Sequence, residues 1–181
     1  LSLHAQSNVN PPSVLIEKAE KESNLVDKKY VGYVEAIDTV AVQPRVSGNI
    51  LSKHFQEGGI VQEGQLLFEI EDTQYIARVQ NSKAQIAQID SRMEYALLSL
   101  DRYQRLANSA SVAQDTVDSS KTNLSTLSAE RLAAEAELAI AEDNLRYTKI
   151  ISPIKGRAGR VSYSVGNYIT PQSGSLLTIT N

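Results

Sequence analysis

The chain has 181 residues, enough for one or two domains, and a net charge of −3 without a basic run, so we expect no nucleic-acid partner. It contains no cysteine, which excludes disulfides, thiolate metal sites and thiol catalysis. No uncharged apolar run approaches the roughly 20 residues that cross a bilayer.

The N-terminal part of the chain divides into a polar segment and a strand-like segment. Residues 1–23 are polar and contain Pro11-Pro12, which predicts an extended or disordered segment. In residues 24–40, apolar side chains alternate at Val31, Tyr33 and Val40, which is typical of strands. We expect these strands to belong to a β-barrel domain of which the chain contains only part.

Residues 41–72 are rich in glycine turns and short apolar runs, which predicts a set of β-strands. Their last part, Glu57 to Asp72, reads EGGIVQEGQLLFEIED. This stretch resembles half of the swinging-arm carrier domains that hold biotin or lipoate. Where such a domain displays its lysine, however, this chain reads Asp72-Thr73 and then becomes helical. We therefore expect no cofactor.

Residues 73–149 are predicted to form an antiparallel helical hairpin, because neither glycine nor proline occurs between Gly64 and Pro153. An apolar or small residue recurs at a strict 3-4 spacing, the pattern of two helices that wrap around each other. The expected seam of the first helix is Val79, Ser82, Ile86, Ile89, Met93, Ala96, Leu100, Tyr103 and Ala107. The expected seam of the second is Val117, Ser120, Leu124, Leu127, Arg131, Ala134, Leu138, Ala141 and Leu145.

Polar residues at the predicted helix ends suggest how each helix begins. Asp72 is expected to cap the first helix with its carboxylate. Ser111 and Gln114 have the spacing of a capping box for the second helix. Arg131 occupies a seam position, where it is expected to reduce stability and to fix the register of the two helices.

Residues 150–181 repeat the glycine pattern of the first half-motif. Four positions of the first half align with positions of the second: Gly48 with Gly156 or Gly159, Gly58 with Gly166, Val61 with Ile169, and Gly64 with Gly174. Neither half can bury an apolar face alone. The predicted fold is therefore α+β: one lipoyl-like β-sandwich, split by the helical hairpin, with part of an adjoining β-barrel domain.

Over residues 25–181 the sequence resembles the periplasmic adaptors, or membrane fusion proteins, of the HlyD-like family in tripartite efflux pumps. The resemblance lies in VGYVEAIDTVAVQPRVSG, in EGGIVQEGQLLFEIED, in the hairpin and in LRYTKIISPIKGRAGRVSYSVGNYI. It is strongest to adaptors of resistance-nodulation-division (RND) transporters.

The resemblance implies a non-enzymatic protein of the Gram-negative periplasm, associated with the inner membrane. Its expected partners are an inner-membrane RND-type transporter, a TolC-type outer-membrane channel, and copies of itself in a ring. Export of drugs or toxic compounds is the implied task. The family's hairpin tip meets the channel through arginine, leucine and serine. Here the tip DRYQRLANSASVA supplies Arg102 and Leu106, while Ala113 takes the serine position and Ser109 and Ser111 precede it.

Two alternatives stay open at this point. One is an adaptor of a type I secretion system or of another ATP-driven exporter. The other is a carrier subunit of a biotin- or lipoate-dependent enzyme, which the missing apical lysine disfavours. The motif Ser152-Pro-Ile-Lys155 has the S-x-x-K form of serine acyl enzymes, but its companion motifs are absent from the sequence. No histidine cluster has the spacing of a zinc site.

Overall fold

The computed structural model describes residues 10–21, 28–109 and 113–181. The chain divides into two compact units, Leu1–Val34 and Glu35–Asn181. In the described part of the first unit no residue is helical or in a strand. The strand predicted around Val31 and Tyr33 is therefore wrong, and the Tyr33 side chain is 95% exposed. Alternation alone does not make a strand, because the backbone groups also need a neighbouring strand as partner.

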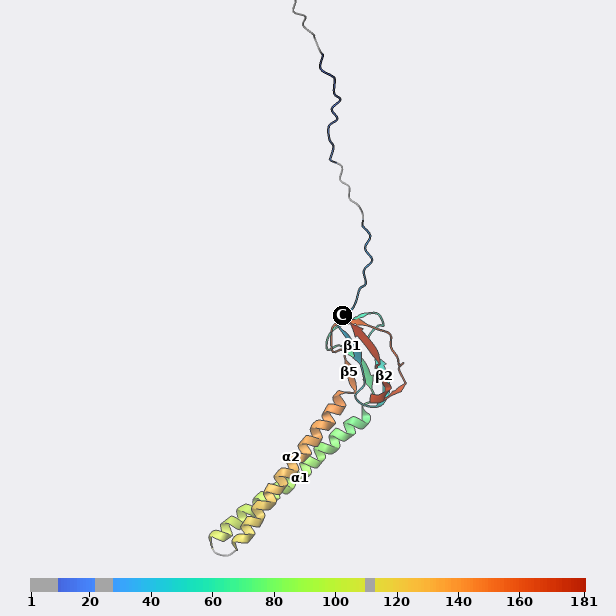
Figure 1. Cartoon of the computed structure of the whole chain (residues 1–181). Helices are drawn as coiled ribbons and strands as arrows, with labels where there is room; N and C mark the ends of the chain where they lie inside the picture. Colours follow the sequence, from blue (N-terminus) through green and yellow to red (C-terminus); the bar gives the residue numbers. More distant parts are fainter. Residues whose placement is uncertain (1–9, 22–27, 110–112) are drawn as a thin grey trace, which may run out of the picture. The chain divides into compact units, whose positions relative to one another are not determined.

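The second unit contains a β-sandwich of two four-stranded sheets (Figure 1). The first half of the sequence supplies β1 (Thr39–Val42), β2 (Gly48–Lys53), β3 (Ile60–Val61) and β4 (Leu66–Ile70). The second half supplies β5 (Lys149–Ile151), β6 (Gly156–Ala158), β7 (Tyr168–Ile169), the 3-10 turn η1 (Pro171–Ser173) and β8 (Leu177–Thr180).

Each sheet takes two strands from each half of the sequence. One sheet has the order β1-β8-β6-β3, and the other has the order β5-β4-β2-β7. If four is added to each strand number, with the numbering starting again at β1 after β8, the first order becomes the second. The two halves therefore occupy equivalent positions, and each completes the other's sheet with antiparallel pairs. This confirms the predicted split sandwich.

The aligned glycines have matching structural roles. Gly58 and Gly166 have φ of 76° and 90°, and Gly64 and Gly174 have φ of 75° and 81°. Glycine adopts this left-handed backbone at little cost, so it is the default residue for such turns. The first aligned pair is also settled: Gly48 begins β2 and Gly156 begins β6.

The core lies between the two sheets and draws on both halves. Its largest fully buried side chains are apolar and include Ile50, Leu67, Phe68, Ile169, Leu176 and Ile179. The ring of Phe55 meets Phe68 edge-on, with ring centroids 5.3 Å apart. Because each half contributes only part of this buried surface, the sandwich forms only when both halves are present.

The two long helices, α1 (Thr73–Asn108) and α2 (Gln114–Arg146), connect β4 to β5 and lie side by side (Figure 1). They occupy the place where a carrier domain would display its lysine. Every predicted seam residue is buried or half-buried, whereas most other helical positions are exposed. The Tyr75 hydroxyl donates to the Ser47 carbonyl at 2.7 Å, which ties the first turn of α1 to the sandwich.

The predicted side-chain cap of α1 is wrong, and α2 begins later than predicted. Asp72 is the N-cap of α1, but its side chain makes no capping hydrogen bond. Instead its backbone carbonyl accepts from the amides of Tyr75 and Ile76, both at 2.9 Å. The N-cap of α2 is Ala113, two residues after the predicted Ser111, which lies outside the described residues. Within the described chain, neither helix is apolar enough over a sufficient length to cross a membrane.

Candidate functional site at the tip of the helical hairpin

The hairpin tip is held away from the sandwich by the length of the two helices. Helices α1 and α2 have 36 and 33 residues. At 1.5 Å per residue each helix spans roughly 50 Å. Since β4 and β5 are already hydrogen-bonded neighbours, the helices leave the sandwich together and continue as a pair. The structure thereby presents one short connection, between Asn108 and Gln114, at the far end.

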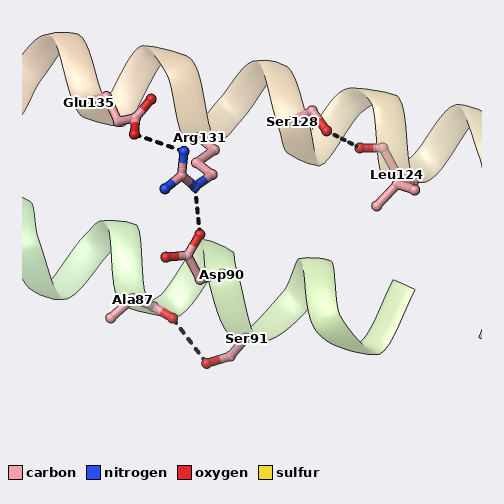
Figure 2. A network of polar contacts seen from close by, with 7 residues as sticks. All are labelled: Ala87, Asp90, Ser91, Leu124, Ser128, Arg131 and Glu135. Atoms are coloured by element: carbon pink, nitrogen blue, oxygen red, sulfur yellow. Dashed lines mark hydrogen bonds and ion pairs between the residues drawn. The ribbon is translucent and has the colours of Figure 1, made fainter. Parts of the chain in front are cut away.

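A polar bridge joins the two helices at the middle of the hairpin (Figure 2). Arg131 of α2 donates from Nε to Asp90 of α1 at 2.7 Å, and from a terminal nitrogen to Glu135 of its own helix at 2.7 Å. The Asp90 hydrogen bond, together with the negative charge of Glu135, raises the pKa of Arg131. The arginine predicted at a seam position thus has a specific partner on the other helix.

Three of the described tip residues lie in the last two turns of α1 and at its C-cap. Arg102, Leu106 and Ser109 are spaced by four and three positions, and residues at this spacing share a helix face. All three are exposed, and the Leu106 side chain is 38% accessible to solvent. Ala113 is exposed on the other side of the connection. Ser111, the fifth predicted residue, lies outside the described part of the chain.

Two arginines near the tip differ in their partners. Arg105 forms an ion pair with Asp101 one turn earlier in α1. Arg102 has no carboxylate partner among the described residues, and its side chain is exposed. A guanidinium group of this kind retains its donors for another molecule, such as the carbonyl groups at the end of a partner's helix.

Near the tip, a charged side chain stabilises the end of each helix. Arg105 lies in the last turn of α1, and Asp115 lies in the first turn of α2. Each charge opposes the partial charge of its own helix end. The Ser109 hydroxyl also donates to the Leu106 carbonyl at 2.9 Å, which satisfies one of the last carbonyls of α1. These charges and this hydrogen bond stabilise the described helix ends on the two sides of the connection.

Neither the Ser152 motif nor the contacts of His54 have the arrangement of a hydrolytic site. Ser152 is completely buried, and its hydroxyl donates to the Ile154 carbonyl at 2.6 Å. The Nε2 atom of His54 lies 2.8 Å from the Ser52 hydroxyl and 3.2 Å from a Glu69 carboxylate oxygen. A hydrolytic relay needs the two ring nitrogens to contact different partners, whereas here one nitrogen contacts both.

Comparison with known proteins identifies the family. The model of the RND membrane fusion protein (MFP) barrel-sandwich hybrid domain matches residues 38–180. This chain belongs to the RND membrane fusion protein family. A curated relative, the multidrug resistance protein MdtA of Pantoea ananatis, is 38% identical over 151 residues, covering 83% of this membrane fusion protein and 37% of MdtA. The toluene efflux pump periplasmic linker protein TtgA of Pseudomonas putida is 32% identical over 169 residues, covering 93% of this chain and 40% of TtgA.

Solved structures agree with the family assignment. A MacA–MexA chimeric protein that contains the Pseudomonas aeruginosa MexA α-hairpin domain matches with a TM-score of 0.62 and 29% identity, over 81% of this chain and 49% of the chimera. ZneB from Cupriavidus metallidurans matches with a TM-score of 0.58 and 25% identity, over 81% of this chain and 63% of ZneB. The chain spans about two fifths of the length of MdtA and of TtgA.

One feature of this membrane fusion protein was missed by sequence reasoning. Asp90 bridges to Arg131, 41 residues away along the chain. Asp90 directly follows the seam residue Ile89, so it lies beside the seam rather than on the outer face of α1. A search for carboxylates beside the seam at the height of Arg131 would have found it.

Proposed function

We propose that this membrane fusion protein is a periplasmic adaptor that links an inner-membrane RND-type transporter to a TolC-type outer-membrane channel, for the export of drugs or toxic compounds. The observation that carries the proposal is a hairpin with an exposed tip, mounted on a sandwich of the barrel-sandwich hybrid family. The names of the relatives, an efflux pump periplasmic linker and a multidrug resistance protein, support it.

In this proposal Arg102, Leu106, Ser109, Ser111 and Ala113 contact the channel. Arg102 donates to carbonyl groups at the channel's helix ends, and Leu106 supplies the apolar contact. Alanine at position 113 lacks a hydroxyl group, so the remaining polar contacts of the tip come from its arginine and serines.

The same proposal covers the association of copies of the chain and the place where the protein acts. Copies of the chain pack side by side in a ring, because exposed apolar side chains such as Tyr95, Leu98, Leu132 and Ile140 leave the single hairpin incompletely covered. The protein acts in the periplasm beside the inner membrane, binds no cofactor and has no catalytic residue.

The test is drug susceptibility in cells that express the full-length protein in place of the chromosomal copy. Arg102→Ala and Leu106→Ala are expected to reduce the tolerated drug concentration at least about fourfold, since each removes a contact of about 1–3 kcal/mol from the docked tip. Arg105→Ala is the matched control, because Arg105 is in the same turn but is paired with Asp101. Unchanged tolerance in both tip variants, at equal protein levels, contradicts the proposal.

A further inference from the structure

A groove runs along one side of the sandwich, between the edge strands of the two sheets. β1 is the last strand of one sheet and β5 is the last strand of the other. The space between them continues to the C-terminal end of α2 and has a volume of about 420 Å³. This volume is within the range of about 300–1,000 Å³ that is typical of small-molecule sites. Its wall includes Val40, Val42, Tyr147, Ile150, Ile151 and Pro153.

The charged side chains that line this groove are all cationic. They are Arg45, Arg146 and Lys149, and no carboxylate belongs to the lining. The chain as a whole has more acidic than basic residues, with a net charge of −3. The groove is therefore a local concentration of positive charge beside an apolar wall.

Two of these cations share one aromatic ring. The guanidinium carbon of Arg45 lies 4.9 Å from the centroid of the Tyr147 ring, and that of Arg146 lies 5.6 Å from it. The ring attracts each cation through its negative face. Both guanidinium groups are thereby held beside the ring, and their N–H donors can reach an anionic ligand in the groove.

The cations differ in how far other residues already neutralise them. Arg146 is paired with Asp143 at 2.9 Å, and Lys149 lies opposite Glu69 in the β4–β5 ladder. Arg45 has no carboxylate partner among the described residues; its guanidinium group contacts the Tyr147 ring instead. Arg45 is consequently the cation best able to bind a ligand's negative group.

We propose that this groove is a binding site for a small amphipathic anion, with a single carboxylate or sulfonate group on a flat apolar body. The anionic group accepts hydrogen bonds from Arg45 and faces Arg146, and the apolar body covers the valine, isoleucine and proline side chains of the wall. Charge-assisted hydrogen bonds fix the ligand's orientation, and burial of apolar surface supplies the remaining affinity. This site is separate from the hairpin tip and does not depend on the proposed docking to a channel.

The test compares two dyes that share a phenylaminonaphthalene body. The anionic dye is 8-anilinonaphthalene-1-sulfonate, and the neutral dye is N-phenyl-1-naphthylamine. In fluorescence titrations of the purified full-length protein, the anionic dye is expected to bind one saturable site at least about tenfold more tightly than the neutral one, the factor that a charge-assisted hydrogen bond supplies. Equal affinities for the two dyes would overturn the proposal.

Substitutions in the groove test whether the anionic dye binds there. Arg45→Gln is expected to weaken binding of the anionic dye at least about tenfold and to leave the neutral dye unaffected. Arg105→Gln, at the distant tip, is the control and should match the unmodified protein. Should Arg45→Gln fail to fold, Ile151→Glu serves instead, since it places a carboxylate on an exposed part of the wall and should also weaken the anionic dye. Unchanged binding of the anionic dye in a folded groove variant rejects the site.

Discussion

At the scale of single residues, neighbouring strands of the same sheet approach so closely at two glycines that a side chain there would have no space. A Cβ atom at Gly156 would lie 2.5 Å from the carbonyl oxygen of Thr180 in the neighbouring strand β8. The equivalent Gly48 would meet the Ile70 side chain at 2.5 Å, which a rotation can partly relieve. Backbone atoms cannot move aside without breaking the ladder, so Gly156 is the more restricted position.

Gly156→Ala is therefore expected to destabilise the protein by about 1–3 kcal/mol, the usual range for forced overpacking. Gly32→Ala is the control, because a Cβ atom there has no neighbour within 4 Å. The measurement is the free energy of unfolding by urea for the two variants and the unmodified protein. Equal stability of the two variants would show that β6 and β8 are farther apart than described.

A second prediction at this scale concerns the acid sensitivity of Glu69. The hydroxyl of Ser52 donates to its carboxylate at 2.7 Å, and this bond, with the neighbouring His54, lowers the pKa of Glu69 below its ordinary value of 4.5. A carboxylate with a lowered folded-state pKa stabilises the fold above its ordinary pKa, and that stabilisation is lost as the pH falls through the lowered value. Because the group is exposed to solvent, the effect is small.

Glu69→Gln should accordingly reduce the urea midpoint slightly at pH 7, and the gap to the unmodified protein should shrink at pH 3. Both proteins are measured at the two pH values in the same salt. A gap that stays constant, or that widens at pH 3, would be inconsistent with the described hydrogen bond to the ionised Glu69.

At the scale of elements, the helical seam was predictable and the helix caps were not. Positions such as Val79, Ile89 and Leu127 repeat at a spacing set by helix geometry alone, so the sequence pattern identifies them directly. Asp72 has the residue type of a side-chain cap, but its backbone carbonyl makes the capping contacts. The bridge from Arg131 to Asp90 depends on the relative height of the two helices, so it is found only when the two seams are aligned with each other and not from either helix alone.

Two leucines of α2 allow the seam to be tested with matched substitutions. Leu127 is 7% exposed in the seam, and Leu132 is 69% exposed on the outer face. We expect Leu127→Ala to cost about 2–4 kcal/mol of unfolding free energy, and Leu132→Ala to cost less than about 0.5 kcal/mol. Helix content followed by circular dichroism during urea unfolding reports both values. Similar costs for the two variants would contradict the described seam.

At the scale of the whole molecule, the two halves of the sandwich were recognisable from their glycines, but the order of the strands in each sheet was not. Pairs such as β1 with β8 join residues more than a hundred positions apart. The strand expected near Val31 was wrong for a related reason, since its pairing partner is not specified by its own sequence. Strand pairing is a property of the assembled chain, whereas glycine turns are a local property.

Because β4 and β5 are antiparallel neighbours, a two-residue Asn-Gly turn should replace the entire hairpin. The Ile70 amide donates to the Thr148 carbonyl at 2.8 Å, so the two strand ends already lie side by side. Deletion of residues 71–147 with this turn inserted is expected to leave a folded β-protein that unfolds cooperatively but supports no drug efflux. Loss of the β-sheet signal in circular dichroism would show that the helices are needed to form the sandwich.

In the proposed function the far end of the hairpin docks on the outer-membrane channel, with Leu106 at the contact. A photoreactive amino acid is introduced at Leu106, or at Leu98 as a control on the same helix, in the full-length protein in living cells. After irradiation, the crosslinked products are identified by mass spectrometry. We predict that the Leu106 position captures a TolC-type channel and that the Leu98 position does not. Capture of the channel from Leu98 but not from Leu106 would contradict the docking of the tip.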